Sequence, residues 1–568
     1  MKQNPKIVEV AMEIAYSAEL LDKIFHRYGA NAARACAMSN SVGGIGPLLK
    51  ERIIAQADLG INVIGVCLLY NNVWIQASHL WGQIYIEKKA VGSYLRETLE
   101  DSGIQFNLKM PDGSDCKVKV WKTELGKGTV YYLDVPEISD VIYPGPEDAP
   151  KNHKNQGEWI ESQKLKQGWL VGRGTLGLLK ALGTQPDILI QSETPTFFAN
   201  HFLVMDEYQK DPFFKDIKYI FNDHTPLEYA HPNWGETQIK KALIDPAYSQ
   251  AELYWNKQSK TIDVTRLLLG VSHAVYGVSK KHAQVMKSMI SLRGFENKIQ
   301  SITNGVRLQD WQDPDYQTAL TKQDTYLIAL KEKKKADLIE WVWKQYRLWY
   351  SWRENAKGKC LVLWTRRVTG YKRFDVLQRL LKDPQLKARF LRTQILVMLG
   401  GRIHQNDDLS QNVIFELIDL VTQDPELKDR VLVLENYNIW VAPKLFQGID
   451  ATIMLADDGR EASATGFMKA QVNGAMVIAS NDGAIPESVY FQGKMDEAHR
   501  DLENGFDVPY VNGQPQPEGL MNAFEQLDKV YKDSKTRARM VRASFQVQGQ
   551  VSVERCAKEM IKLYSTLI

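Results

Sequence analysis

Short apolar runs that alternate with helix-like segments are the feature of this sequence that most constrains its fold. In the second half of the chain these runs occupy Cys360–Trp364, Ile395–Leu399, Val431–Leu434, Ala451–Leu455 and Ala475–Ser480. Each run is short enough to be one strand, and segments with helical spacing lie between them. Strands that alternate with helices at short intervals predict a parallel, doubly wound sheet with helices on both faces.

The first half of the chain shows the same alternation and carries an all-β insertion. Ile61–Tyr70 and Pro186–Gln191 are expected to be buried strands, whereas residues 73–145 alternate and carry the turn signals of antiparallel strands. We expect residues 147–167 to form a polar loop and Leu267–Val278 to contain a strand. The first half is therefore also predicted to be an α/β domain.

The length of the chain predicts more than one domain. A chain of 568 residues is too long for a single hydrophobic core. We place an N-terminal α/β domain at 1–305 and a C-terminal α/β domain at 306–545. Helices are expected at 519–534 and 536–568, and we expect the segment 546–568 to pack back on the first domain. The cleft between two such domains is the expected position of a ligand site.

The composition excludes several classes of function. The net charge is +3, from 71 Lys and Arg against 68 Asp and Glu, so it gives no support for a nucleic-acid partner. The five cysteines are scattered without CxxC spacing, which predicts reduced thiols, no zinc site and a cytoplasmic protein. The chain shows no secretory leader and no apolar run of the ~18 residues that a membrane span needs. The oligomeric state stays open, a homo-oligomer included.

A cluster of cations follows the strand Cys360–Trp364. The segment Thr365–Arg373 contains four positive side chains within eight residues, with Gly370 in the turn. Such a cluster at a strand-to-helix junction favours a phosphate or pyrophosphate ligand, and surface charge is the alternative. The run Lys331–Lys335, by contrast, is predicted to be a solvated helix face and not a binding patch.

The segment Glu461–Lys469 joins the strand Ala451–Leu455 to a predicted helix. Small residues at a helix start leave backbone N–H groups accessible, which favours an anion over that start. Ala464, Thr465 and Gly466 have the small side chains that such an approach requires. An ordinary turn with a solvated lysine is the alternative.

Two segments of the first half also place polar groups or glycines where ligands bind. The glycine-rich loop Ser39–Gly46 enters a helix, so Gly43 and Gly44 are candidates for backbone contact with an anion or a sugar, although such turns are more often structural. His224 follows the strand-like run Tyr219–Asn222, and ligands of α/β sheets bind beyond the carboxyl ends of strands. A structural histidine at a strand end is the alternative for His224.

Together these motifs resemble the α-glucan (glycogen, starch or maltodextrin) phosphorylases, in the shorter bacterial and archaeal form. The resemblance covers most of the chain in short patches, which are Met12–Ile14, Ser41–Gln76, Asn222–Pro226, Gly277–Lys280, Ile302–Val306, Thr365–Arg373, Leu434–Tyr437 and Glu461–Glu487. It implies the GT-B architecture, in which two doubly wound Rossmann-like domains face each other across a cleft. It also implies pyridoxal phosphate as cofactor, inorganic phosphate as co-substrate, an α-glucan as substrate, and α-glucose 1-phosphate as product.

The resemblance assigns a role to individual residues. It implies that Lys469 carries pyridoxal phosphate, that Thr465 and Gly466 hold the cofactor's phosphate, and that Tyr437 lies beside the cofactor. The cations implied to bind the substrate phosphate are Arg367 and Lys372. The remaining substrate contacts are implied for Gly43, Gly44, His224, Asn304, Glu461 and Ala464.

Two departures from the family pattern leave alternatives open. Ala464 stands where the family usually has glycine, and Phe467 where it has a small or polar residue. Either change could narrow the sugar pocket or prevent cofactor binding. The alternatives to a phosphorylase are a retaining GT-B transferase that uses a nucleotide-sugar donor without pyridoxal phosphate, and a glucan-binding protein without catalysis. Retention of Lys469 favours the phosphorylase.

Overall fold

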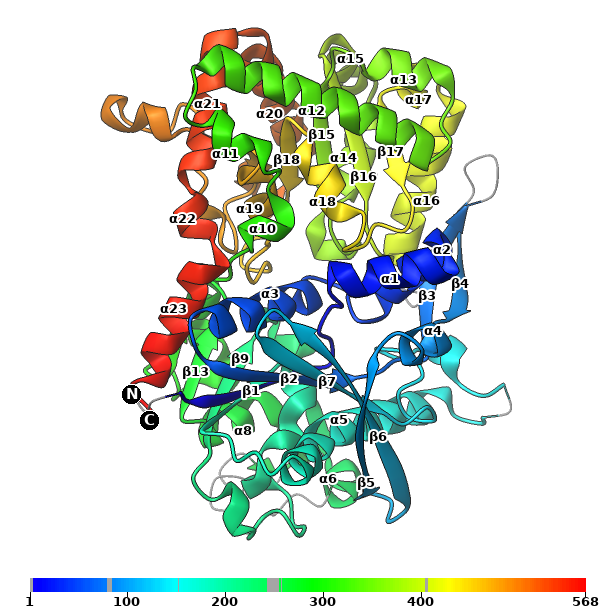
Figure 1. The fold of residues 1–568 in the computed structure, drawn as a ribbon. Coiled ribbons are helices and arrows are strands. Elements are labelled where there is room, and N and C mark those ends of the chain that lie inside the picture. The colour runs from blue at the N-terminus through cyan, green and yellow to red at the C-terminus, as the bar shows by residue number, and fades with distance from the viewer. Residues whose placement is uncertain (1–3, 79–83, 152, 243–254, 257, 404–406) are drawn as a thin grey trace. The chain divides into compact units, whose positions relative to one another are not determined.

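A computed structural model describes residues 4–78, 84–151, 153–242, 255–256, 258–403 and 407–568 and divides the chain into two compact units. Unit 1 consists of Met1–Trp74, Lys88–Thr303 and Cys556–Ile568, and unit 2 consists of Ile75–Glu87 and Asn304–Arg555. Figure 1 shows the elements of both units. Within the described residues, no helix is long and apolar enough to cross a membrane.

Unit 1 is built on a nine-stranded sheet. Its strands are β1 (Lys6–Val10), β2 (Asn62–Leu68), β5 (Glu100–Lys109), β6 (Asp115–Leu125), β7 (Gly128–Asp134), β8 (Ile188–Ser192), β9 (Lys218–Asp223), β13 (Ala274–Gly277) and β14 (Ile299–Ser301). Their spatial order is β14-β13-β9-β8-β1-β2-β7-β6-β5. Pairing is parallel from β14 to β7 and antiparallel from β7 to β5. The chain reverses its winding direction between β1 and β8, which is where an open α/β sheet binds its ligand.

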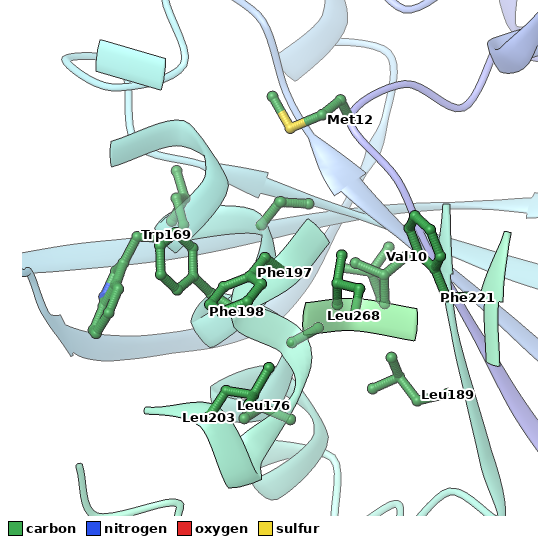
Figure 2. Packing of buried hydrophobic residues seen from close by; sticks show 14 of the residues in the cluster. Val10, Met12, Trp169, Leu176, Leu189, Phe197, Phe198, Leu203, Phe221 and Leu268 are labelled. Carbon is green, nitrogen blue, oxygen red and sulfur yellow. The ribbon is translucent and has the colours of Figure 1, made fainter. Parts of the chain in front are cut away.

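Helices cover both faces of the unit 1 sheet. They are α1 (Ala18–Tyr28), α2 (Ala30–Ser39), α3 (Ile45–Asp58), α4 (Gly92–Arg96), α5 (Gln156–Ala181), α6 (Glu236–Lys241), α8 (Val264–Val271) and α9 (Lys280–Ser288). Ile53 of α3 lies over Gly65 of β2, whereas Gly174 of α5 lies against Leu133 of β7 on the opposite face. The core beneath α5 and α8 is rich in aromatic and branched side chains (Figure 2).

Unit 2 is built on a six-stranded parallel sheet. Its strands are β15 (Cys360–Thr365), β16 (Ile395–Gly400), β17 (Val431–Leu434), β18 (Ala451–Met454), β19 (Met476–Ala479) and β20 (Gly505–Asp507), in the order β17-β16-β15-β18-β19-β20. Numbered from β15, this is the order 3-2-1-4-5-6 of a Rossmann sheet. The switch point therefore lies between β15 and β18.

Both faces of the unit 2 sheet are buried, as near-continuous apolar strands require. Val362 and Val397 belong to one core, and their neighbours Leu361 and Leu396 belong to a second core on the other face. The helices of the unit are α10 (Leu308–Trp311), α11 (Asp315–Ala319), α12 (Asp324–Gln345), α13 (Tyr350–Ala356), α14 (Asp375–Lys382), α15 (Pro384–Arg392), α16 (Asp408–Gln423), α17 (Pro425–Lys428), α18 (Ala442–Gln447), α19 (Gly466–Gln471), α20 (Pro517–Lys532), α21 (Ser534–Gln546) and α22 (Gln548–Val551). The last helix, α23 (Val553–Tyr564), begins in unit 2, and its residues from Cys556 belong to unit 1.

Smaller strand pairs complete the description. They are the two-stranded sheet of β3 (Asn72–Ser78) and β4 (Ile84–Ala90), the three-stranded sheet of β10 (Asn233–Gly235), β12 (Thr261–Asp263) and β11 (Trp255–Asn256), and the two-stranded sheet of β21 (Tyr510–Val511) and β22 (Gln514–Pro515).

Two local predictions from the sequence were wrong, and a third was incomplete. Residues 156–167 are not a loop but the first turns of the 26-residue helix α5, which begins at the capping side chain of Asn155. Polar side chains dominate these turns, which are mostly exposed or half-buried, so their few apolar residues do not mark a clear helix face. Leu267–Val278 contains the expected strand, β13, but its first residues are the end of α8, since a short apolar run does not separate a helix from a strand. The predicted helix 536–568 is three helices.

The charge run Lys331–Lys335 is also not a solvated face. Lys331 and Lys335 are each only 2% exposed. The Lys331 amine donates to the carbonyl oxygens of Ile449 (2.6 Å) and Asn473 (3.0 Å), and Lys335 pairs with Asp450 at 3.1 Å. A lysine side chain is long enough to reach from the surface of α12 to the buried start of β18. The charge pattern of the sequence alone does not reveal such a contact.

Candidate functional site

The switch point of the unit 2 sheet carries a buried cluster of two cations and one carboxylate. Glu461, in the loop after β18, is 8% exposed. Its Oε2 accepts hydrogen bonds from the Arg366 guanidinium and, at 3.1 Å, from the Lys372 amine, both in the loop after β15. Burial alone would raise the pKa of Glu461, but the charges of Lys372 and Arg366 lower it to about 2. The carboxylate is therefore ionised at neutral pH.

Asp482 fixes the backbone from which Glu461 projects. This residue follows β19 and is buried, and its Oδ2 accepts the backbone N–H groups of Arg460 and Glu461, each at 2.9 Å. The next residue, Gly483, has a φ of +56°, and a Cβ added there would lie 2.8 Å from the Ser463 carbonyl oxygen. Only glycine allows this close approach of two loops. Sequence reasoning did not single out Asp482 or Arg366.

The segment Thr365–Arg373 contains two more cations, Arg367 and Arg373, and neither of them contacts Glu461 in the way that Arg366 and Lys372 do. Arg367 is exposed on the loop after β15. Arg373 is buried, has a left-handed backbone (φ 59°), and pairs with Asp375 and Asp457 at 2.9 and 3.0 Å. The guanidinium of Arg373 is thus already neutralised by two carboxylates of the fold.

Lys469 lies in α19, immediately beyond the Glu461 loop. The lysine is 7% exposed, and its amine lies 3.9 Å from the ring centroid of Trp311. A Cβ added at Gly466, the first residue of α19, would lie 2.4 Å from Met454 Cε and 3.8 Å from the Thr365 carbonyl oxygen. The start of α19 therefore packs directly against the ends of β18 and β15, and a larger residue at Gly466 would require the Met454 side chain to move.

The two departures from the family pattern have different consequences. Phe467 is fully buried in the core of unit 2 and so contributes to packing. Ala464 has a left-handed backbone with φ of 60°, a conformation that favours glycine and costs an alanine about 1–2 kcal/mol. Ala464 thus has a backbone conformation that glycine adopts readily, and its side chain adds one methyl group to the loop.

The residues around Lys469 fit pyridoxal phosphate. Ser463 Oγ is buried and, within the part of the chain that the structure describes, has no hydrogen-bond partner. A buried hydroxyl without a partner is costly, so it indicates a polar ligand. Thr465 and Gly466 are only partly buried, and an amine lies on the same short helix.

Tyr437 lies beside the same strand ends. A Cβ added at Gly400 would lie 3.3 Å from both Tyr437 Cβ and Thr365 Cγ2, so these residues surround the end of β16. Burial raises the pKa of Tyr437 to about 12. The loop before it is clamped by Asn436, which exchanges backbone and side-chain hydrogen bonds with Gln76 of β3.

In unit 1 the glycine loop is tied to the segment after β1. The backbone N–H of Val42 donates to Glu13 Oε2 at 2.6 Å, and Ala15 donates its N–H to the Gly46 carbonyl at 3.0 Å. A Cβ added at Gly43 would meet no atom within 4 Å, whereas one at Gly46 would lie 2.4 Å from the Asn40 carbonyl oxygen. Gly44 has an ordinary right-handed backbone before α3. The fold therefore requires glycine at Gly46 but gives no steric reason for one at Gly43.

His224 ends a buried chain of hydrogen bonds in unit 1. Arg52, paired with Glu9, donates to Ser192 Oγ at 3.3 Å, and Ser192 donates to Asn222 Oδ1 at 2.7 Å. Asn222 Nδ2 in turn lies 2.6 Å from His224 Nε2. Burial and the Arg52 charge lower the pKa of His224 to about 3, so the ring is neutral. Because Nε2 accepts from the Asn222 amide, the ring proton is on Nδ1, which makes Nδ1 a donor.

Asn304 and Glu193 are two further polar residues near the ends of strands. Asn304 is buried at the start of the second segment of unit 2, and its carbonyl oxygen accepts a hydrogen bond from Arg555 at 2.8 Å. Glu193 follows β8, and its carboxyl group accepts the backbone N–H of His224, although no sequence motif assigned it a role. The feature that draws attention to Glu193 is its positive φ of 68°, and a backbone angle cannot be read from the sequence.

Comparisons with known proteins identify the relatives of this chain. Residues 319–489 match the family model described as carbohydrate phosphorylase, and residues 32–301 match the starch synthase catalytic domain. The maltodextrin phosphorylase of Thermococcus litoralis is 23% identical over 510 residues, covering 78% of this chain and 58% of the relative. The glycogen phosphorylase of Mycobacterium tuberculosis is 22% identical over 557 residues, covering 84% of this chain and 61% of the relative. The chain thus spans about three fifths of the length of these two relatives.

A solved structure confirms the predicted fold class. The catalytic domain of starch synthase IV from Arabidopsis thaliana, bound to ADP and acarbose, superposes with a TM-score of 0.71 at 17% identity and covers 99% of both chains. Two Rossmann-like α/β units of this kind constitute the GT-B fold, and the matches to phosphorylases confirm the resemblance predicted from the sequence.

Proposed function

Because the chain is related to the α-glucan phosphorylases and has their GT-B fold, we propose that it is a glycosyltransferase that catalyses reversible phosphorolysis. The substrates are an α-1,4-glucan and inorganic phosphate, and the product is α-glucose 1-phosphate with retained configuration. The observation that carries the proposal is the buried Lys469 on α19, together with a buried hydroxyl, Ser463 Oγ, in the loop before this helix that has no hydrogen-bond partner among the described residues. An enzyme that uses a nucleotide sugar has no use for an amine there.

In this proposal unit 2 binds the phosphate. Lys372 and Arg366 share the Glu461 carboxylate, which keeps two cations together in a buried place. Arg367, exposed on the same loop, adds a guanidinium that can bind phosphate in a bidentate way. Each charge-assisted contact to phosphate contributes about 1.5–3 kcal/mol. Positioning and electrostatics of this kind need no pair of catalytic carboxylates, unlike a glycosidase.

In the same proposal Lys469 holds pyridoxal phosphate, with Ser463, Thr465 and Gly466 around its phosphate and Tyr437 beside it. When bound, the cofactor supplies a phosphate group that exchanges a proton with the substrate phosphate. The protein residues hold that group in place, and the packing of α19 against β15 and β18 keeps the amine fixed relative to the Glu461 cluster.

Unit 1 contributes the remaining contacts. The accessible backbone at Gly43 and Gly44 binds the substrate phosphate, which explains a glycine that the fold itself does not require. Neutral His224 donates from Nδ1 to the sugar at the cleavage point without adding a charge. The Asn304 amide donates hydrogen bonds to sugar hydroxyls and accepts hydrogen bonds from them, the ionised Glu461 carboxylate accepts hydrogen bonds from them, and Ala464 limits the space beside them.

The test combines a spectrum and an assay. We expect near-ultraviolet absorbance from bound pyridoxal phosphate in the wild type, absent in Lys469→Ala and retained in the exposed-lysine control Lys444→Ala. The wild type should release glucose 1-phosphate from maltoheptaose and phosphate. A colourless protein that takes up no cofactor, or activity only with a nucleotide sugar, would refute the proposal.

Activity with a nucleotide sugar, the second of these outcomes, is supported by the starch synthase matches. The starch synthase model matches residues 32–301, and a starch synthase covers 99% of this chain in structure. A nucleotide-sugar transferase is therefore the alternative function, with Arg367 and Lys372 binding a pyrophosphate and Lys469 acting as an ordinary lysine. Binding of glucan without turnover of either donor would instead favour a binding protein.

A further inference from the structure

Glu193 has a strained backbone at the carboxyl end of β8. Its φ of 68° and ψ of 159° belong to a region that only glycine adopts readily. A glutamate held there costs about 1–3 kcal/mol, and such strain concentrates at functional sites. Its backbone N–H still donates to the Asn222 carbonyl of β9 at 3.1 Å, so the strand pairing continues to this point. The fold thus tolerates strain in order to place this side chain.

The Glu193 carboxyl group lies on the His224 turn. Its Oε1 accepts the backbone N–H of His224 at 2.9 Å, and both carboxyl oxygens lie 3.1 Å from Thr225 Oγ1. The side chain is partly exposed, so a ligand that contacts His224 can also reach it. The same turn therefore presents a neutral imidazole donor and a carboxyl group side by side.

The surroundings of Glu193 favour its protonated form. Burial and the neighbouring Asp223 carboxylate raise the pKa of Glu193 to about 8. Asp223 itself stays ionised because it pairs with His231, at 3.2 Å, and this pairing raises the pKa of His231 to about 9. The titratable and charged groups near this turn are Glu9, Arg52, Asp223, His224, His231, Asp263 and His282.

We propose that Glu193 is a further substrate-contacting residue, whose carboxyl group hydrogen-bonds a hydroxyl group of the sugar unit that His224 binds. The inference rests on the proposed function for the identity of the sugar. A protonated carboxyl group donates and accepts at once, as a sugar hydroxyl does, and it adds no charge beside the neutral imidazole. Oε1 accepts the His224 backbone N–H, Thr225 Oγ1 lies near both carboxyl oxygens, and Oε2 is the oxygen that contacts the ligand.

The experiment compares Glu193→Gln, Glu193→Ala and the exposed control Glu207→Gln by calorimetric binding of maltoheptaose at about pH 6.5 and about pH 9.5. Glutamine keeps an acceptor for the turn and a neutral donor for the ligand. We expect wild-type affinity to weaken by about fivefold at the higher pH, as loss of one hydrogen bond predicts. Glu193→Gln should bind equally at both pH values, and Glu193→Ala should bind about fivefold more weakly than wild type at the lower pH.

A ligand-free measurement tests the protonation state on which the predicted pH dependence rests. The folded-state pKa of Glu193 is raised above its ordinary value of 4.5, so wild type loses stability relative to Glu193→Gln as pH rises from about 4.5 to about 8. A parallel melting curve for the two proteins across this range, or equal pH dependence of their maltoheptaose affinity, would overturn the inference. Failure of wild type to bind maltoheptaose at any pH would overturn the proposed function and this contact together, whereas pH-independent wild-type binding would overturn the contact alone.

Discussion

Replacing Glu461 by glutamine removes the single carboxylate shared by Arg366 and Lys372. The pKa of Glu461 in the folded protein is about 2 against an ordinary 4.5, which corresponds to about 3 kcal/mol of stability at about 1.4 kcal/mol per pH unit. Removing one partner of a buried ion pair costs a similar 3–5 kcal/mol. We therefore expect Glu461→Gln to unfold about 6 °C below wild type at neutral pH, at about 2 °C per kcal/mol for a protein unit of this size.

The pH dependence of this difference has a definite sign. A carboxyl group whose folded-state pKa is lowered stabilises the protein above its unfolded-state pKa, and the contribution disappears as pH falls. The gap in melting temperature between wild type and Glu461→Gln should therefore be constant above about pH 5 and narrow as pH falls from 4.5 toward 2. Differential scanning calorimetry over this range measures it.

Inorganic phosphate provides the second part of the assay. The variant leaves two buried cations without their carboxylate, so phosphate should raise its melting temperature more than that of wild type. Glu416→Gln, which removes a carboxylate that is 54% exposed and paired with Lys382, is the control and should change stability by less than about 0.5 kcal/mol. Equal melting of Glu461→Gln and wild type at neutral pH, or a gap that does not change with pH, would refute the electrostatic account of this cluster.

Three further predictions address single residues. Gly43→Ala should fold like wild type but bind phosphate more weakly, whereas Gly46→Ala should lower the melting temperature because its Cβ would overlap a backbone oxygen; thermal melts and phosphate titrations distinguish them. Arg367→Ala should raise the phosphate concentration needed for half-maximal activity by about tenfold or more, while Arg373→Ala, whose guanidinium is already paired, should change it little; similar small effects at both would mean that the loop charge is not a phosphate site. The folded-state pKa of Lys331 is lowered to about 8 by burial, so wild type should gain stability relative to Lys331→Met as pH rises from about 8 to about 10.5, and a constant difference in denaturant melts would contradict this.

Much of the second unit was predictable because its strands are local patterns. The apolar runs from Cys360–Trp364 to Ala475–Ser480 correspond to β15, β16, β17, β18 and β19, and buried parallel strands require such runs. Charge and small residues alone made the segments that follow β15 and β18 candidates for an anion site, and the family resemblance then assigned roles to their residues. Their roles stay predictions, but the structure brings Lys372 and Glu461 together at the switch point.

Prediction failed where the sequence pattern does not distinguish two structures. The first turns of α5 are mostly polar and show no clear apolar face, and the run that includes the end of α8 is apolar in either conformation. In the candidate site, Arg366 and Arg367 are adjacent and chemically identical in the sequence. Only the direction of the chain after β15 decides that Arg366 is buried against Glu461 and that Arg367 is exposed.

The sequence by itself determined the fold class, the order of the strands along the chain and the residue types at the strand ends, because periodicity and turn chemistry are local properties. Tertiary structure alone decided which strands are neighbours, and hence that loops almost ninety residues apart, after β15 and β18, share one carboxylate. It also decided the protonation states, since the ionised Glu461 and the raised pKa of Glu193 depend on burial and on charges from distant segments. The local sequence pattern determines the helices and strands, whereas the pKa of each group depends on all the charges and the burial that the tertiary structure places around it.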